Sequence, residues 1–357
     1  MSKILYVASN MQHINNFHLP YIERLREDGN TVLVMASGEG ADFDVRFKKS
    51  IFSVKNLLSQ IKIRKIVKAE GFDSIILNTT LAAFHVRMAL PKKKRPRVMN
   101  IVHGYLFHEG EGGLKKRLYL FCEKLLRKKT DMLVLMNAED ERIAKENSLT
   151  DGEIINVCGM GASVAEEKIS PASIRKFTGT EDAYLIGFVG ELSARKNQRF
   201  LICALPEIRI YAPNAALMLV GKGAEEDSLR ALADRLGVSE AVHFVGHKDN
   251  PCDFIRSFDL YASASEIEGM PFNIIEAIGC GAPILASMIK GHEDLITDGE
   301  EGYLYERGNM GDFVSKVKAF YLGDISVNAE SQKLAFDKYS FGRAFEQTYS
   351  VLKAFVK

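Results

Sequence analysis

Residues 3–9 read KILYVAS, a short run that is apolar almost throughout. Such runs are typical of parallel strands that are buried on both faces. Similar runs recur along the first half of the chain, at residues 31–36, 74–77, 98–102, 132–136 and 154–157. Between them we expect a polar loop at residues 10–16, a helix at residues 20–27 and further helix-like stretches. Strands that alternate with helices predict a parallel sheet with right-handed crossovers.

The pattern then restarts after a polar segment, residues 165–182, which is interpreted as a linker. A second series of strands is expected at residues 184–189, 216–220, 242–245, 260–262 and 283–286, with an amphipathic helix at residues 225–236. The sequence therefore predicts an α/β fold of two Rossmann-like, doubly wound domains, residues 1–165 and 166–340. A final helix is expected at residues 341–357. In open α/β sheets, ligands bind at the carboxyl ends of the strands.

The composition excludes several classes of protein. The chain has 357 residues, with 47 Lys+Arg against 46 Asp+Glu and 46% hydrophobic side chains, which excludes disordered, collagen-like and coiled-coil proteins. No apolar run is as long as a membrane span, and the N-terminus lacks the pattern of a secretory signal. The five cysteines lie far apart without a CxxC pair, which indicates a reduced, cytoplasmic chain without a cysteine zinc site.

The charge is distributed unevenly. Residues 1–180 hold 29 basic and 20 acidic side chains, and the remainder holds 18 and 26. The excess is greatest at residues 46–129, with 21 basic and 5 acidic side chains. The first half is therefore expected to face something anionic, and both nucleic acid and an acidic membrane surface fit that description.

Residues 265–283 read SEIEGMPFNIIEAIGCGAP and carry the most informative motif. Glu268 stands eight positions before Glu276, and Gly269 and Pro271 lead into an expected helix. Proline is preorganised for a helix start, and the free N–H groups of a first turn can hold a phosphate oxygen. The alternative is that the two glutamates are solvated carboxylates on a surface helix.

This segment resembles the E-x7-E signature of family 4 glycosyltransferases, which have the two-domain GT-B fold with the domains facing each other across a cleft. The resemblance implies that Glu268 lies near the donor sugar and that Glu276 holds the nucleotide ribose. The segment supplies the expected nucleotide-sugar contacts Met270, Pro271, Phe272, Asn273 and Glu276.

Residues 187–197, GFVGELSARKN, resemble the loop after the first strand of that family's second domain. The resemblance implies that Gly190 approaches the ligand and that Arg195 and Lys196 neutralise its diphosphate. Many relatives carry Arg where this chain has Glu191, so one diphosphate contact stays open, and Arg195 and Lys196 are alternatively surface charges. Lys222 and His247 follow two later strands, where the family receives the nucleotide base; the alternative is that both mark ordinary turns.

In the first domain, residues 102–110 (VHGYLFHEG), 127–140 and 13–20 resemble a subgroup of family 4 enzymes from bacterial capsule and exopolysaccharide synthesis. The resemblance covers nearly the whole chain. It implies that His103 lies near the reacting centre, that His13 and Tyr105 lie on the acceptor side, and that the helix at 341–357 packs back on the first domain. A lone histidine is alternatively a structural residue.

Residues 114–129 hold seven basic side chains and one acidic one, with apolar residues at helical spacing. This pattern is typical of a helix that lies on anionic lipid, with Lys115, Lys116 and Arg117 among its contacts and the basic run at 92–95 adding to the attraction. The alternative is an ordinary helix with its leucines in the core. Nucleic acid is the rival partner, but no motif supports it, and we expect none to bind.

Together these features predict a retaining glycosyltransferase that moves a hexose or N-acetylhexosamine from a UDP-sugar to a lipid-linked, polyprenyl diphosphate glycan. UDP is favoured because it is the commonest nucleotide in the subgroup. No metal is expected, because no Asp-x-Asp metal motif stands where the mechanism would need one and the basic pair can replace a cation. The expected location is cytoplasmic, at the inner face of the plasma membrane. A UDP-sugar epimerase of the same fold and a non-catalytic nucleotide-sugar-binding subunit are the alternatives. The oligomeric state has no signal.

Overall fold

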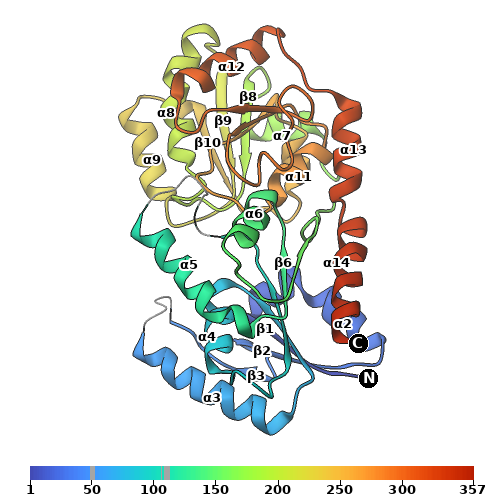
Figure 1. The fold of residues 1–357 in the computed structure, drawn as a ribbon. Helices are drawn as coiled ribbons and strands as arrows, with labels where there is room; N and C mark the ends of the chain where they lie inside the picture. Colours follow the sequence, from blue (N-terminus) through green and yellow to red (C-terminus); the bar gives the residue numbers. More distant parts are fainter. Residues whose placement is uncertain (49–52, 106, 108–112) are drawn as a thin grey trace. The chain divides into compact units, whose positions relative to one another are not determined.

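The computed structural model describes residues 1–48, 53–105, 107 and 113–357. The chain divides into two compact units, each of which has its own sheet and its own helices (Figure 1). Unit 1 comprises Met1–Met160 together with Ala344–Lys357, and unit 2 comprises Gly161–Arg343.

The described residues of unit 1 form a seven-stranded parallel sheet of order β3-β2-β1-β4-β5-β6-β7. Its strands are β1 (Lys3–Asn10), β2 (Thr31–Ser37), β3 (Phe43–Asp44), β4 (Ser74–Asn78), β5 (Arg97–Ile101), β6 (Met132–Leu135) and β7 (Glu153–Asn156). Every strand expected in this half is present. The edge strand β3 was not predicted, since two residues are too few to give a pattern.

Helices cover both faces of this sheet. They are α1 (Met11–Phe17), α2 (Leu19–Glu27), α3 (Val54–Glu70), α4 (Thr80–Ala89), α5 (Leu114–Leu126), a 3₁₀ turn (Arg127–Lys129), α6 (Ala138–Glu146) and most of α14 (Phe341–Val356). The expectation of a loop at residues 10–16 was wrong. The Asn10 side chain accepts a hydrogen bond from the His13 N–H and so caps α1, and the helix buries Ile14.

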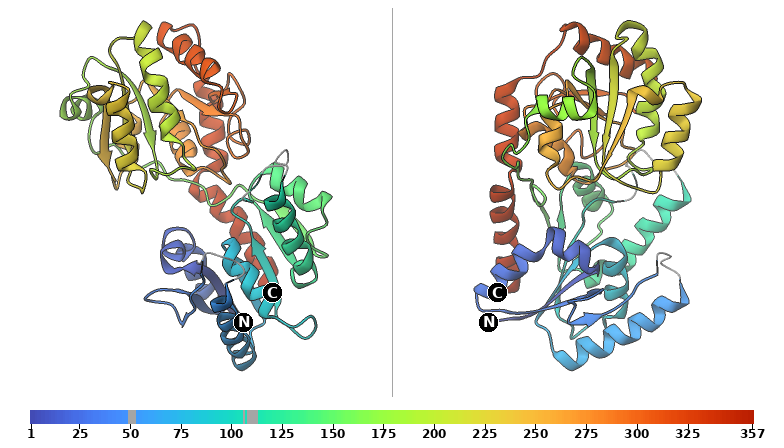
Figure 2. Two further views of the ribbon diagram at one scale, coloured as in Figure 1. Left: turned by 90° about the vertical axis from the view of Figure 1, so that its left-hand side faces the viewer. Right: turned by 180° about the vertical axis from the view of Figure 1, so that it is seen from behind.

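The α14 segment of unit 1 lies beside α2 (Figures 1 and 2). The Phe345 ring stacks on Tyr21 with 4.7 Å between centroids. The Tyr349 hydroxyl donates to Asp28, whose carboxylate also pairs with Lys353. Unit 1 is therefore built from two stretches of chain that are separated by the whole of unit 2.

The described residues of unit 2 form a six-stranded parallel sheet of order β10-β9-β8-β11-β12-β13. Its strands are β8 (Tyr184–Val189), β9 (Ala215–Val220), β10 (Val242–Gly246), β11 (Leu260–Ser263), β12 (Ile284–Ser287) and β13 (Tyr303–Tyr305). The five expected strands are present, and β13, which is only three residues long, was missed.

The helices of unit 2 include one in the segment that was expected to be a linker. They are α7 (Pro171–Thr178), α8 (Gln198–Tyr211), α9 (Glu226–Arg235), a 3₁₀ turn (Ser239–Ala241), α10 (Pro251–Ile255), α11 (Phe272–Gly279), α12 (Met310–Leu322) and α13 (Ala329–Tyr339). The linker interpretation of residues 165–182 was wrong over α7. Ser170 caps this helix, Pro171 occupies its first turn, Gly179 ends it in a left-handed conformation, and Ile174 is buried.

Both sheets reverse their strand order next to their first strand, between β1 and β4 in unit 1 and between β8 and β11 in unit 2. Open α/β sheets bind ligands at the carboxyl ends of the strands at such a point. The prediction of two parallel-sheet, Rossmann-like folds is confirmed. None of the helices in the described part of the chain is long and apolar enough to cross a membrane.

Candidate active site

In unit 2, the loops that follow β8 and β9 press against each other. The N–H of Gly190 donates to the Val220 carbonyl at 2.9 Å, and the N–H of Leu192 donates to the Lys222 carbonyl at 3.1 Å. Gly221 has a φ of +146°, and a Cβ at this position would lie 1.9 Å from the Gly190 carbonyl oxygen. Only glycine permits this approach, which keeps the two loops together at the edge of the sheet.

A pocket of about 520 Å³ opens between these loops and the end of β10, and its size is typical of a small-ligand site. Its lining includes Gly190, Glu191, Gly221, Lys222 and His247. The structure thus brings three residues that the sequence analysis had assigned to nucleotide binding, Gly190, Lys222 and His247, to one pocket. Lys222 and His247 are exposed, so both are accessible to a ligand.

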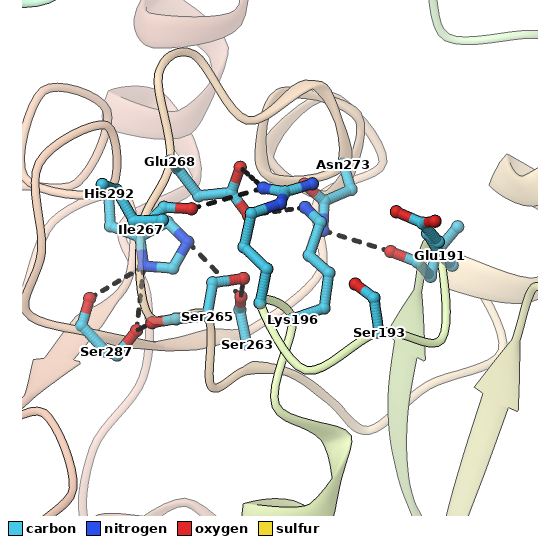
Figure 3. Close-up of polar contacts among 12 residues, drawn as sticks. Glu191, Ser193, Lys196, Ser263, Ser265, Ile267, Glu268, Asn273, Ser287 and His292 are labelled. Atoms are coloured by element: carbon cyan, nitrogen blue, oxygen red, sulfur yellow. Dashed lines mark hydrogen bonds and ion pairs between the residues drawn. The ribbon is translucent and has the colours of Figure 1, made fainter. Parts of the chain in front are cut away.

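Glu268 lies beside the same sheet edge and is held by two cations (Figure 3). Its Oε2 lies 2.7 Å from Arg195 Nη1, and its Oε1 lies 2.6 Å from Lys196 Nζ. The side chains of Lys196 and Glu268 are only 9% and 6% exposed, whereas that of Arg195 is 42% exposed. The loop after β8 is therefore joined to the loop after β11 by a largely buried charge cluster.

The pKa values of Glu268 and Lys196 depend on both burial and the charges around them. Burial by itself raises the pKa of Glu268, but the charges of Lys196 and Arg195 outweigh it and lower that pKa below its ordinary value. Burial also lowers the pKa of Lys196, and the charge of Glu268 opposes this effect. Glu191 also acts on Lys196, and its charge likewise opposes the effect of burial on the pKa of Lys196.

The expected helix start follows at α11. Met270, Pro271 and Asn273 are buried and Phe272 is half-buried, while the N-terminus of the helix receives no side-chain cap. Asn273 Nδ2 donates to the Val189 carbonyl at 3.1 Å and to the Tyr261 hydroxyl at 2.8 Å. This amide therefore fixes the start of α11 against the end of β8.

Glu276 lies one turn into α11 and is half-buried. Burial, together with the nearby Cys252, raises the pKa of Glu276 to about 7. A hydrogen bond with Cys280 lowers the pKa of Cys252, which favours a negative charge beside the carboxyl. Glu268 and Glu276 thus have opposite environments, since one is paired with cations and the other is desolvated next to a thiol.

Sequence reasoning missed a buried polar group behind Glu268. His292 Nδ1 donates to the Ser287 carbonyl at 2.8 Å, and its Nε2 lies 3.3 Å from Ser263 Oγ (Figure 3). Burial lowers the pKa of His292 to about 4, so the ring is neutral. The small polar residues Ser263 and Ser265 at the end of β11 were the available signal, but His292 follows no recognisable pattern.

In unit 1, three histidines gather at the carboxyl edge of the sheet. His13 lies in α1, His18 at the junction of α1 and α2, and His103 in the loop after β5. Their ring centroids are 5.0 to 5.3 Å apart. Burial lowers the pKa of His13 to about 4, that of His103 to about 3, and that of His18 well below its ordinary value. His18 was not among the predicted site residues.

Tyr105, expected on the acceptor side, is buried in the core of unit 1. Its ring stacks on Phe107 with 5.4 Å between centroids, and its N–H donates to Asp140 Oδ2 at 2.9 Å. These contacts give Tyr105 a packing role. Residues 106 and 108–110 of the same predicted segment lie outside the described residues.

The basic helix α5 exposes most of its apolar side chains. Leu114, Leu118, Phe121 and Leu125 are exposed, whereas Leu126 is buried against Phe84 and Cys122. The alternative that the leucines of this helix pack in the core holds for Leu126 and is wrong for Leu114, Leu118 and Leu125.

The predicted basic contacts of this helix lie near its start. Arg117 is exposed and Lys116 is half-buried, while the side chain of Lys115 lies outside what the structure describes. A buried ion pair between Glu123 of α5 and Arg87 of α4, at 2.8 Å, attaches the helix to the sheet layer. The opposite side of α5 is thereby left to solvent.

The chain is similar to known glycosyltransferases. Residues 171–333 match the family model described as "Glycosyl transferases group 1". The chain is 28% identical over 372 residues to the putative glycosyltransferase EpsD of Bacillus subtilis (strain 168), and the match covers 99% of this chain and 97% of EpsD. It is 24% identical over 276 residues to the Escherichia coli UDP-Gal:alpha-D-GlcNAc-diphosphoundecaprenol alpha-1,3-galactosyltransferase, covering 75% and 71% of the two chains.

Solved structures agree on the fold. The crystal structure of Anabaena Alr3699/HepE in complex with UDP and glucose matches with a TM-score of 0.78 at 19% identity, covering 99% of this chain and all of that one. Sucrose-phosphate synthase from Thermosynechococcus elongatus matches with a TM-score of 0.76 at 16% identity, covering 99% and 100%. The chain thus has the GT-B fold, and its match to the group 1 glycosyl transferase model lies within unit 2.

Proposed function

We propose that the protein is a retaining glycosyltransferase that moves a hexose or N-acetylhexosamine from a UDP-sugar to a hydroxyl of a lipid-linked, polyprenyl diphosphate glycan in bacterial surface polysaccharide synthesis. The observation that carries the proposal is the cluster of Glu268 with Arg195 and Lys196 beside a nucleotide-sized pocket. In this proposal Arg195 and Lys196 bind the donor diphosphate, and Glu268 contacts the donor sugar.

The cations stabilise the leaving group in this proposal. The bond between the anomeric carbon and the diphosphate oxygen breaks, the acceptor oxygen bonds to the same face of that carbon, and the acceptor proton passes to the leaving diphosphate. Negative charge develops on the diphosphate, and Arg195 and Lys196 with the uncapped start of α11 stabilise it. This arrangement needs no metal ion at the diphosphate.

The remaining groups position the donor. Glu268 orients the sugar hydroxyls, and Glu276 accepts hydrogen bonds from the ribose hydroxyls in its ionised form. Lys222 and His247 line the pocket in which the base is received. UDP is supported by two relatives, since the Anabaena protein is in complex with UDP and the Escherichia coli enzyme is named for UDP-Gal.

The acceptor and the location are supported by the same Escherichia coli relative and by α5. That relative is named for a diphosphoundecaprenol acceptor. The exposed Leu114, Leu118, Phe121 and Leu125 stand among basic side chains, which suits a helix at an anionic lipid surface. We propose that α5 docks the protein on the inner face of the plasma membrane, close to such an acceptor, and that no nucleic acid binds there.

The first test is a thermal-shift panel of UDP, GDP, ADP, CMP and their sugars, because a ligand of the folded state raises the melting midpoint by mass action. UDP and UDP-sugars are expected to shift the wild type and to shift Glu276→Ala much less. Glu240→Ala, which removes an exposed carboxyl of the same unit, serves as the matched control and should respond like the wild type. Absence of any nucleotide-dependent shift would refute the donor site.

Turnover with and without a lipid-linked acceptor then separates the alternatives. The transferase releases UDP and forms a longer glycan only when acceptor is present. An epimerase would convert the UDP-sugar without acceptor, and a non-catalytic subunit would bind UDP but turn over nothing. Flotation with anionic and neutral vesicles tests membrane docking by α5. The double variant Phe121→Ser/Leu125→Ser should no longer bind the anionic vesicles.

A further inference from the structure

The three histidines of unit 1 point ring nitrogens at one another. His13 Nε2 and His18 Nε2 lie 3.2 Å apart. A ring nitrogen of each of His13, His18 and His103 lies within 4.8 Å of the others, and His103 Nε2 is buried without a hydrogen-bond partner among the described residues. A buried nitrogen without a partner is costly, so this geometry calls for a further ligand between the rings.

A metal ion would satisfy all three nitrogens. Ligand nitrogens around tetrahedral Zn²⁺, each about 2.0–2.1 Å from the ion, lie about 3.3 Å apart. The His13–His18 separation of 3.2 Å is close to this value already, and His103 needs to approach by at most about 1.5 Å. His18 is buried and His13 and His103 are half-buried, so the ring nitrogens that would bind the ion are partly shielded from water.

The surroundings also supply the usual support for a metal ligand. His18 Nδ1 lies 3.0 Å from the buried hydroxyl of Tyr6. In the tautomer in which His18 Nδ1–H donates to that hydroxyl, Nε2 carries the lone pair and faces His13. Metal-bound histidines commonly donate their second N–H in this way, which fixes the tautomer and the orientation of the ring.

We propose that His13, His18 and His103 bind a Zn²⁺ ion at the carboxyl edge of the unit 1 sheet, with a fourth coordination position open to water or to an oxygen of a ligand. Three imidazoles without a carboxylate favour zinc over Mg²⁺ and Ca²⁺, which prefer oxygen ligands. All three proposed ligands belong to unit 1, and the inference does not depend on the proposed transfer reaction.

The test is zinc binding by the full chain after treatment with a chelator, measured by competition with a chromophoric zinc indicator. The wild type is expected to bind one Zn²⁺ per chain. His13→Gln and His103→Gln should weaken binding by more than tenfold, and His243→Gln, which removes a half-buried imidazole of unit 2, should not change it. Tyr6→Phe keeps all three ligands and should weaken binding by about tenfold.

Two further measurements distinguish zinc binding by the three histidines from loss of folding in the variants and from zinc binding by cysteines. The metal-free variants must melt cooperatively, which shows that lost binding does not reflect lost folding. Replacement by Co²⁺ reports the ligands, because the close cysteine pair Cys252 and Cys280 would give a thiolate charge-transfer band and histidines would not. Substoichiometric zinc in the wild type, a thiolate band, or full binding by His13→Gln and His103→Gln would overturn the proposal.

Discussion

Replacing Glu276 by glutamine should stabilise the protein in alkaline solution while weakening its affinity for UDP. The carboxyl is half-buried in α11, and burial together with Cys252 raises its pKa from 4.5 to about 7. The folded state therefore holds a proton on this group between about pH 4.5 and pH 7, where the unfolded chain has released it. Stability from this group is full below pH 4.5 and is lost as the pH rises through 7.

The size of the effect follows from the shift. A rise of about 2.5 pKa units corresponds to about 3 kcal/mol at most, and the partial exposure of Glu276 lowers the expected value to about 1–2 kcal/mol. Glutamine has the shape of the protonated acid and carries no charge, so Glu276→Gln should match the wild type at pH 5. At pH 8 it should be more stable by that amount, or by about 2–4 °C in melting midpoint per kcal/mol.

The affinity for UDP should change in the opposite direction. The ribose hydroxyls donate to the ionised carboxylate in the proposed complex, and a hydrogen bond to a charged group contributes about 1.5–3 kcal/mol. Wild-type binding of UDP should therefore tighten from pH 6 to pH 8, whereas binding by Glu276→Gln should be about ten- to a hundredfold weaker at pH 8 and insensitive to pH in this range.

Melting curves at pH 5, 6, 7 and 8 under reducing conditions, with and without UDP, measure both effects on the same samples. Glu240→Gln, an exposed carboxyl of unit 2, is the matched control and should follow the wild type throughout. If the difference between Glu276→Gln and the wild type is the same at pH 5 and pH 8, the carboxyl is not desolvated and the reasoning fails.

Three further predictions concern the loops and the buried ion pairs. Lys196→Met leaves the buried Glu268 with one cation and should lower the free energy of unfolding in urea by about 3 kcal/mol. Arg195→Ala, at a side chain that is 42% exposed, should lower it by less than about 1 kcal/mol. Both variants should strongly reduce sugar transfer, and equal losses of stability would contradict this assignment. Gly221→Ala would place a Cβ 1.9 Å from the Gly190 carbonyl oxygen, so it should lower the free energy of unfolding by more than about 2 kcal/mol and weaken UDP binding. An unchanged melting midpoint would contradict the close approach of the two loops. Arg87→Met strands a buried carboxylate of α5 and should cost about 3–5 kcal/mol in urea unfolding, and a loss below 1 kcal/mol would show that α5 is not held by this pair.

The strands of both sheets could be predicted because buried parallel strands are nearly continuous apolar runs, as at residues 3–9 and 184–189. The elements that the sequence did not predict are an edge strand and a helix that depends on its N-cap. The edge strand β3 pairs through only two residues, Phe43 and Asp44. The helix α1 depends on a side-chain cap from Asn10 in a segment whose polar composition indicates a loop.

Site residues that stand in a sequence motif could be predicted, whereas contacts between residues that only the fold brings together could not. Glu268, Arg195 and Lys196 stand in two recognisable segments, yet their contact arises because β8 and β11 are neighbours in the sheet. His292 has no motif of its own and joins its cluster through the packing of loops distant in sequence, whereas His18 stands five residues from His13 in the predicted segment 13–20 and was not selected from it. Periodicity and spacing carry no information about such contacts.

The division of unit 1 into two stretches affects how the protein is made on the ribosome. Residues 344–357 are translated only after the whole of unit 2, which is one continuous stretch of chain. Until they emerge, the Tyr21 ring lacks its stacking partner and Arg97 lacks the Phe355 carbonyl to which it donates in the finished unit. During synthesis, unit 2 can therefore complete its packing before unit 1. Until residues 344–357 are translated, the part of unit 1 that they contact stays exposed to solvent.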